Sequence, residues 1–463
     1  MLIRGAELEG GEIADVRIEH GIVAAIGRLH HRNDEPIIEA AGNLLLPGLH
    51  DHHIHVAALA ASLSSVRCGP PQVTDFDSFV ACLQVPGNDW VRATGYHESV
   101  AGMLDAATLD RIVANRPVRV QHRSGRMWFF NSVALDALLS RSSAPSGLDR
   151  NAGRLFDDDG WLQRTLGSTP PSFEAVGAML ARWGVTGLTD MSPRNDAFMA
   201  RHFIAETAIQ ALPQRVLLAG KLELTKADTN RRVLLGPAKL HLHEAALPPL
   251  DEAADVIRSA HERNRHVAIH CATEVELIFA LAALGDAGVL SGDRIEHAAV
   301  ASESVIADIA RAGLAVVSQP HFIRERGDRY LKDVDADARP LLYRLRAFLD
   351  ANVSLAGGTD APSGAPNPWA SMAAAVSRQT QRGACIGPAE ALTPEQALDL
   401  YLRAPQSLNQ RRRVVAGAPA DFCLLDRSWA EARKSLASVQ VYATFVEGRQ
   451  IFKQSTGIMH ECV

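Results

Sequence analysis

The sequence predicts an α/β fold: a (β/α)8 TIM-like barrel with a small β-sandwich domain formed from both chain ends. Short apolar stretches alternate with amphipathic stretches through much of the chain, which is typical of a parallel sheet with helical crossovers. Histidine, lysine and aspartate follow several of these apolar stretches, where a barrel places its active site. Both chain ends instead hold short strand-like segments separated by turns.

The two chain ends share one pattern. Residues 1–43 contain short apolar stretches broken by turn signals such as Gly10-Gly11, and no segment has the length and period of a helix. The region from about 414 to 453 returns to short strands. We therefore expect residues 1–48 and 410–463 to combine into a small composite β-domain, and residues 49–409 to form the barrel domain.

A histidine cluster follows the first apolar run of the barrel region, in the stretch LLLPGLHDHHIH at residues 44–55. We expect the run LLLPG to be the first barrel strand, with the histidines at its tip. Alternate residues of a strand share a face, so His53 and His55 point the same way and His52 points away. Two such imidazoles can hold one metal ion, and a histidine-rich surface turn is the alternative.

Residues 56–172 lack a clean alternation of strands and helices and contain several proline and glycine clusters. We interpret this region as a large insertion after the first strand, with helices of its own. In a barrel such an insertion lies over the mouth and helps to shape the pocket.

From Ser172 onward, strand-like apolar runs alternate regularly with amphipathic helical segments. This pattern predicts seven further strands, which brings the expected total to eight. A capping box, Thr393-Pro394-Glu395-Gln396, then starts a helix. The seven expected strands are VTGLTDM (185–191), RVLLAG (215–220), KLHLHE (239–244), HVAIHC (266–271), RIEHA (294–298), AVVSQP (315–320) and VSLAGGTD (353–360).

Chemically active side chains stand at the ends of several strands: Lys239, His270, His297 and Asp360, in addition to the first histidine pair. A single buried histidine is often only a hydrogen-bonded core residue. Several such groups at the same end of a barrel are costly to bury without partners, and a metal ion supplies one. The set therefore predicts a metal site.

The order of the motifs PGLHDHHIH, HVAIH, RIEH and GGTDAP resembles the amidohydrolase superfamily of metal-dependent hydrolases. The branch that it resembles contains N-substituted formamide deformylase. The segments FFNSVAL, LTPEQALDLYLRAPQ and GAPADFCLLDR are similar to segments of that branch, so the resemblance covers essentially the whole chain.

The resemblance implies a set of metal ligands: His53, His55, Lys239, His270, His297 and Asp360. The first pair would bind the more buried metal, and His270 and His297 would bind a second metal or orient the substrate carbonyl. In some members the matching lysine is carboxylated and bridges two metals. This chain reads HLHEAA where an Asp-Gly pair is expected, so the choice between one and two ions stays open. The alternative for Lys239 is a strand lysine paired with an acid.

The implied activity is hydrolysis of a C–N bond in an amide, imide or cyclic amide by attack of a metal-bound hydroxide. Asp360 and His297 would be the catalytic residues, and Asp360 would carry the proton to the leaving nitrogen. Deamination, hydrolysis of an ester or lactone, and a non-catalytic binding protein with a retained barrel are the alternatives. The candidate substrate-binding residues are Tyr96, His97, Arg126, Gln319 and His321.

Composition narrows the expected partners. Hydrophobic residues make up 47% and charged residues 22% of the chain, and the net charge of −6 argues against nucleic-acid binding. No apolar run reaches the roughly 20 residues that span a membrane, and no secretion signal is evident. The six cysteines form no CxxC pair, which predicts reduced thiols in a cytoplasmic protein. We expect a small-molecule substrate and a divalent metal, for which zinc suits the histidines, and the resemblance implies a homodimer.

Overall fold

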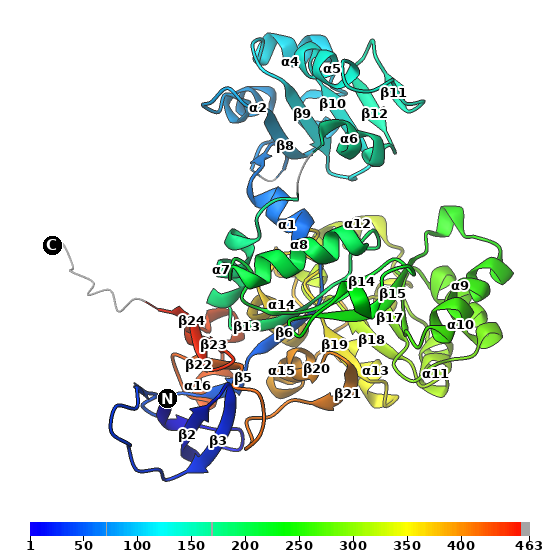
Figure 1. Ribbon diagram of the computed structural model, residues 1–463. Coiled ribbons are helices and arrows are strands. Elements are labelled where there is room, and N and C mark those ends of the chain that lie inside the picture. Colours follow the sequence, from blue (N-terminus) through cyan, green and yellow to red (C-terminus); the bar gives the residue numbers. More distant parts are fainter. Residues whose placement is uncertain (71, 168–169, 455–463) are drawn as a thin grey trace. The chain divides into compact units, whose positions relative to one another are not determined.

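The computed structural model describes residues 1–70, 72–167 and 170–454, and the chain divides into two compact units (Figure 1). Unit 1 comprises Met1–Val56 and Ser172–Val463, and unit 2 comprises Ala57–Pro171. The bounds of unit 2 are close to those expected for the insertion, 56–172. Residues 455–463, which include Cys462 and end the expected β-domain, lie outside the described residues.

Eight parallel strands of unit 1 form one sheet in the order β19-β18-β17-β16-β15-β14-β13-β6. The first and last strands meet, because the Asp360 amide donates to the His53 carbonyl over 2.6 Å and the His55 amide donates to the Ala361 carbonyl over 2.9 Å. The predicted barrel is confirmed. Its strands are β6 (Leu49–Ile54), β13 (Val185–Asp190), β14 (Arg215–Gly220), β15 (Val233–His241), β16 (Val267–Cys271), β17 (Arg294–His297), β18 (Ala315–Ser318) and β19 (Leu355–Gly357).

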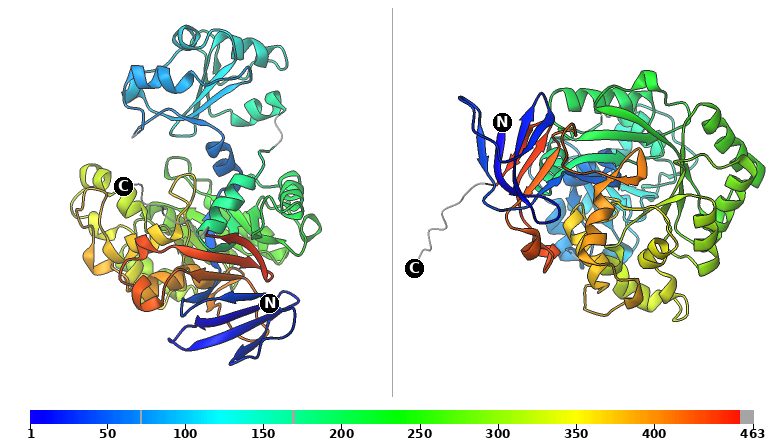
Figure 2. Two further views of the ribbon diagram at one scale, coloured as in Figure 1. Left: turned by 90° about the vertical axis from the view of Figure 1, so that its left-hand side faces the viewer. Right: turned by 90° about the horizontal axis from the view of Figure 1, so that it is seen from below.

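Helices surround the outside of this sheet, as the view from below shows (Figure 2). The capping box expected at Thr393 is confirmed, since the Gln396 amide donates to Thr393 Oγ1 over 3.2 Å and the Thr393 amide donates to Gln396 Oε1 over 2.9 Å. The helices are α7 (Glu174–Arg182), α8 (Ala197–Ala208), α9 (Leu250–Glu262), α10 (Glu274–Ala287), α11 (Glu303–Arg311), α12 (Phe322–Asp333), α13 (Leu345–Asp350), α14 (Pro368–Ser377) and α15 (Pro394–Leu402).

Two four-stranded sheets of unit 1 combine both chain ends, in the orders β3-β2-β1-β4 and β24-β23-β22-β5. Their facing sides form one apolar core, in which Ile3 and Val16 from the first end are buried with Phe422 and Phe445 from the second. The strands are β1 (Leu2–Glu7), β2 (Ile13–Glu19), β3 (Ile22–Gly27), β4 (Ile37–Glu39), β5 (Leu45–Pro47), β22 (Phe422–Leu425), β23 (Val441–Val446) and β24 (Arg449–Lys453).

The expectation that LLLPG is the first barrel strand is wrong. Its residues form β5, which pairs antiparallel with β22 of the sandwich, Leu45 opposite Leu424. The first barrel strand is the histidine segment itself, β6. Pro47 has no amide hydrogen to continue a ladder. Gly48 packs so closely on the next barrel strand that a Cβ there would lie 2.1 Å from the Thr186 side chain. The two residues therefore separate one strand from the next.

Replacing Gly48 with alanine should lower the thermal unfolding temperature, because the new methyl group overlaps the side chain of Thr186. Overpacking of this kind costs about 1–3 kcal/mol. The matched control is Gly285→Ala in α10, where no atom lies within 4 Å of the new Cβ and alanine is the better helix former. Equal unfolding temperatures for the two variants would contradict this account of the strand break.

Strand β15 also differs from the expected KLHLHE strand at 239–244. It begins at Val233 and ends at His241, so His243 and Glu244 lie beyond it. The strand ends there because a local hydrogen bond replaces the hydrogen bonds between strands. His243 Nδ1 accepts a hydrogen bond from the Ala245 amide and caps a 3-10 turn, η2 (Glu244–Ala246).

Unit 2 is built on a six-stranded sheet in the order β11-β12-β10-β9-β8-β7. Asn131 of the FFNSVAL segment joins its parts: the side chain caps α5 at the Ala134 amide and donates to the carbonyls of Val113 and Arg116. The strands are β7 (Val66–Arg67), β8 (Val91–Tyr96), β9 (Val118–His122), β10 (Met127–Phe130), β11 (Leu148–Asp149) and β12 (Arg154–Phe156). The helices are α2 (Phe76–Leu83), α3 (Glu98–Ala101), α4 (Ala106–Ile112), α5 (Ser132–Leu139) and α6 (Asp159–Leu166). That this unit covers the barrel mouth stays a prediction.

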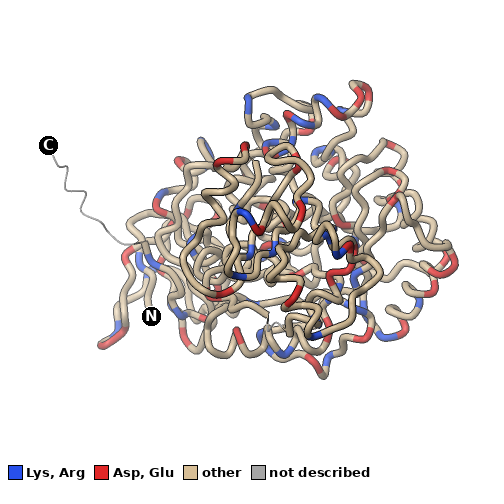
Figure 3. Tube along the Cα trace, turned by 90° about the horizontal axis from the view of Figure 1, so that it is seen from above, with Lys and Arg blue, Asp and Glu red and all other residues tan. Residues whose placement is uncertain are grey.

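Basic and acidic residues are interspersed along the Cα trace (Figure 3). Within the described ranges, every helix is too short or too polar to cross a membrane.

Candidate metal centre

Three predicted ligands meet where the first and last barrel strands join. His55 Nε2 lies 3.1 Å from Asp360 Oδ1, and His53 Nε2 lies 3.6 Å from the same oxygen. One donor atom from each of the three residues lies within 4.8 Å of the other two. Two imidazole nitrogens and a carboxylate oxygen are donors that zinc and similar divalent ions prefer. The group could therefore hold such an ion.

The local backbone explains why these residues meet. His53 and His55 are two residues apart at the end of β6, and β19 ends three residues before Asp360. Asp360 has a φ of 51°, a left-handed conformation that aspartate tolerates better than most residues. At Gly358 a Cβ would lie 2.4 Å from the Cβ of His53, so only glycine allows the two strands to approach this closely.

Asp51 anchors the segment that carries Asp360. Its buried carboxylate accepts hydrogen bonds from the amide and the hydroxyl of Thr359, at 2.9 and 2.5 Å. Burial raises the pKa of Asp51 to about 7, although the bonds from Thr359 oppose this change. The residue next to Asp360 is thereby tied to the first strand.

The other ring nitrogen of each histidine is also held. His53 Nδ1 lies 2.5 Å from Glu296 Oε2, and His55 Nδ1 lies 3.1 Å from Ser192 Oγ. A partner at Nδ1 sets the tautomer and orientation of an imidazole and leaves Nε2 for a metal ion. Both ligand histidines therefore present Nε2 toward Asp360.

A buried ion pair supports the first of these contacts. The Nε atom of Arg294 donates to the other oxygen of Glu296 over 2.6 Å. Burial alone would raise the pKa of Glu296, but the charges of Arg294 and His53 outweigh it and hold that pKa well below its usual range. Glu296 is therefore an ionised carboxylate inside the barrel.

A second group of side chains continues from His53 around the strand ends. The ring of His297 lies 4.8 Å from that of His53 and 4.3 Å from that of His270, and His241 stacks on His270 at 4.2 Å. Burial lowers the pKa of His297 to about 3 and that of His241 to about 4, and it also lowers the pKa of His270. All three imidazoles are neutral near pH 7, as metal ligands must be.

The next predicted ligand is Lys239, which lies in β15. The residue is buried, and in the described part of the chain its ammonium group has no hydrogen-bond partner. Burial lowers the pKa of Lys239 to about 8. A buried ammonium group without hydrogen bonds is costly, so this atom is expected to have a partner in the working enzyme. The donor set of His53, His55 and Asp360 fits a bound metal ion, whereas Lys239 could become a ligand only if its ammonium group were chemically changed.

Two predicted substrate residues lie in unit 1 beyond β18. Gln319 Oε1 accepts a hydrogen bond from His297 Nδ1 over 2.7 Å, which brings Gln319 to the edge of the candidate centre. His321 is buried and already bonded on both ring nitrogens: Nδ1 lies 3.1 Å from Ser371 Oγ, and Nε2 donates to the Thr359 carbonyl over 3.0 Å. In this arrangement His321 supports the Asp360 segment.

The other three candidates lie in unit 2. Tyr96 is buried in the core of that unit, and its hydroxyl donates to the Gly102 carbonyl over 2.7 Å. His97 Nε2 lies 3.5 Å from Glu98 Oε1, and Arg126 donates to Asp157 over 2.7 Å. Their part in substrate binding stays a prediction.

Sequence reasoning did not select Glu296, Arg294 or Ser192. The segment RIEH could have suggested the Arg294–Glu296 ion pair, since the two residues are two positions apart on a strand and so share a face. Ser192 gives no such signal, because its contact with His55 joins two different strand ends.

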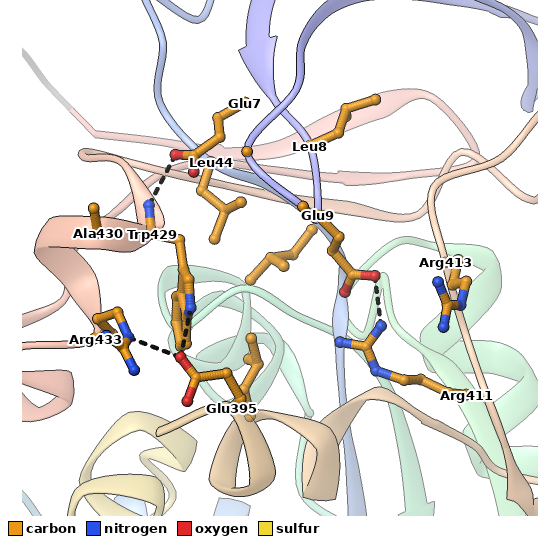
Figure 4. A pocket seen from close by; sticks show the side chains of 14 residues that line it. Glu7, Leu8, Glu9, Leu44, Glu395, Arg411, Arg413, Trp429, Ala430 and Arg433 are labelled. Atoms are coloured by element: carbon orange, nitrogen blue, oxygen red, sulfur yellow. Dashed lines mark hydrogen bonds and ion pairs between the residues drawn. The ribbon is translucent and has the colours of Figure 1, made fainter. Parts of the chain in front are cut away.

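A separate hollow of about 630 Å³ lies between the sandwich strands, α15 and the short helix α16 (Trp429–Ala432) (Figure 4). Its polar side chains are mostly paired: Arg411 donates to Glu9 over 2.5 Å, and Arg433 donates to Glu395 over 2.7 Å. Its lining contains none of the candidate metal ligands. We therefore place the candidate active site at the strand ends.

The comparisons with known proteins agree with this architecture. The model of the amidohydrolase family matches residues 36–452, and the chain belongs to this family. It is therefore an enzyme of the hydrolase class.

Named relatives cover nearly the whole chain. N-substituted formamide deformylase of Arthrobacter pascens is 25% identical, and the match covers 95% of this chain and 93% of the relative. The putative amidohydrolase YtcJ of Bacillus subtilis (strain 168) is 24% identical, and the match covers 96% of this chain and 97% of the relative. The solved structure of an uncharacterized metal-dependent hydrolase from Pyrococcus horikoshii OT3 has a TM-score of 0.76 at 18% identity. The match covers 92% of this chain and 96% of that structure's chain. The resemblance inferred from the sequence motifs is confirmed.

Proposed function

We propose that this chain is a metal-dependent hydrolase that cleaves a C–N bond in an amide, imide or cyclic amide. The observation that carries the proposal is the convergence of His53, His55 and Asp360 at the closing seam of the barrel. A relative along almost the whole chain is named for acting on N-substituted formamides, which are amides. This supports an amide as the substrate class.

We assign the first ion to His53 Nε2, His55 Nε2 and an oxygen of Asp360. When bound, a divalent metal ion lowers the pKa of a coordinated water to about 7 and polarises a carbonyl oxygen. Zinc suits these nitrogen and oxygen donors. The contacts at Nδ1 of each histidine hold the two rings in place for it.

We assign His270 and His297 to a second ion, which Lys239 would help to hold if it were carboxylated. His297 donates from Nδ1 to Gln319, so its Nε2 is an acceptor, and an acceptor suits a metal ligand better than a donor to a carbonyl group. Carboxylation would turn the orphaned ammonium group of Lys239 into an anionic oxygen donor.

Asp360 is the residue that moves the proton. Burial opposes ionisation of its carboxyl group, but the hydrogen bond from His55 holds the pKa of Asp360 below its usual range. Its carboxylate can therefore accept the proton of the attacking water. Delivery of that proton to the leaving nitrogen is the step that an amine leaving group requires.

We propose further that the enzyme acts on a small molecule as a cytoplasmic homodimer. The five described cysteines are free thiols, which supports a reducing compartment. Analytical ultracentrifugation of the full chain tests the dimer, and a sedimentation mass near that of one chain would contradict it.

Elemental analysis of protein purified without chelator tests the proposed metal centre. We expect about two equivalents of a divalent metal per chain if Lys239 is carboxylated and about one if it is not.

Removal of the metal should abolish hydrolysis of a panel of N-substituted amides, and adding the metal back should restore hydrolysis. Products distinguish the reactions: an amine supports the proposal, whereas ammonia released from a ring or an alcohol points to deamination or ester hydrolysis. Metal-free protein that hydrolyses the panel at full rate would contradict it.

A further inference from the structure

Two arginines of unit 2 lie side by side on one face of its sheet. Arg92 of β8 and Arg119 of β9 are register partners in adjacent parallel strands. Such strands are about 4.8 Å apart, and register partners project from the same face. The two positive side chains therefore leave the sheet as neighbours.

Neither arginine has a counter-ion. Among the described residues, neither guanidinium makes a hydrogen bond or an ion pair, and the Nε atom of each is buried. Other arginines of the same unit are bonded: Arg126 to Asp157, and Arg154 to the Leu104 carbonyl. The carboxylate whose charge acts on Arg92 belongs to Asp159, and it already accepts a hydrogen bond from the indole of Trp128.

Two indole rings flank Arg119. Its guanidinium carbon lies 5.6 Å from the ring centre of Trp90 and 5.8 Å from that of Trp128. Contacts of this kind attract a cation to the ring faces but leave its positive charge uncompensated.

The arrangement is unfavourable without a ligand. Burial, together with the neighbouring charge of Arg92, lowers the pKa of Arg119 to about 10. Two like charges that are partly removed from water repel each other more strongly than they would in water. Strongly shifted groups of this kind concentrate at functional sites.

We propose that Arg92 and Arg119 form a binding site for an oxyanion, either a carboxylate or a phosphate group, on the sheet face of unit 2. Planar guanidinium groups bind both anions through paired N–H···O bonds. The site goes beyond the proposed hydrolysis, because it uses none of the metal-centre residues. It would serve an anionic effector.

Tryptophan fluorescence of the full-length enzyme tests the site, since Trp90 and Trp128 lie beside Arg119. We would titrate with sodium benzoate in one series and inorganic phosphate in another, at constant ionic strength set with sodium chloride. We expect a saturable change with at least one anion. Arg92→Met and Arg119→Met, which keep an apolar stem, should weaken it at least tenfold. Arg111→Met, which removes an exposed arginine of the same unit that is already bonded to Thr108 Oγ1, should leave it unchanged.

Thermal unfolding separates a ligand site from a structural role. In buffer without either anion, Arg92→Met should unfold at or above the wild-type temperature because it removes repulsion. The anion should raise the unfolding temperature of the wild type and not that of the variant. A response to benzoate alone identifies a carboxylate site, and a response to phosphate alone identifies a phosphate site. The proposal fails if neither anion gives a saturable response, or if both arginine variants respond as the wild type does.

Discussion

Asp360→Asn should lower kcat by about 10²–10⁴-fold, the range over which a positioned acid or base contributes to catalysis. Asparagine keeps the shape of aspartate and one side-chain oxygen at the position where the donor atoms of His53, His55 and Asp360 meet. It cannot take up the proton of the attacking water. The loss should therefore appear in kcat at full metal occupancy, measured as amine released from an amide substrate.

The control for this variant is Asp350→Asn, which removes an exposed carboxylate that pairs with Arg346 at the end of α13. Its activity should equal that of the wild type. Metal content must be measured for both proteins, because Asp360 is also an assigned ligand. Full activity of Asp360→Asn with its metal site loaded would remove the proposed proton-transfer role.

Glu296→Ala should cause the largest loss of stability of the variants considered. It removes the buried carboxylate that holds both His53 and Arg294, and it leaves the guanidinium of Arg294 buried without its ionic partner. Breaking a buried pair in this way costs about 3–5 kcal/mol. The urea midpoint, followed by circular dichroism in the presence of chelator, should fall accordingly.

The same variant should weaken metal binding about 10–100-fold, because the orientation of His53 is no longer held. Asp350→Ala again provides the comparison, since an exposed ion pair contributes about 0–1 kcal/mol. Glu296→Gln keeps the oxygen acceptor and should bind metal more tightly than the alanine variant. A Glu296→Ala protein with the wild-type urea midpoint would show that the buried pair does not stabilise the barrel.

The sequence was sufficient for the barrel because most of its strands are short apolar runs that end in polar residues, although the first strand, β6, is not. His270 and His297 could be predicted as neighbours for the same reason, since parallel strands align their carboxyl ends. The assignment of LLLPG failed because an apolar run does not show which sheet it joins. Only the pairing of Leu45 with Leu424 places it in the sandwich.

The rest of the site depends on contacts between distant strands. Glu296 meets His53, and Ser192 meets His55, only after the barrel has closed. The pairing of Arg92 with Arg119 likewise requires the register of two strands that are joined by a long connection. Spacing within one segment carries no information about such contacts.

The closing seam of the barrel also sets an order of events during synthesis. His53 and His55 are made about 300 residues before Asp360, yet the three complete one ligand group and the Asp360 amide bonds to the His53 carbonyl. At ribosomal speeds of about 5–20 residues per second, the early histidines wait roughly 15–60 s for their third partner. A nascent chain released before β19 has emerged therefore lacks both the hydrogen bonds that close the barrel and the third ligand of the assigned metal site.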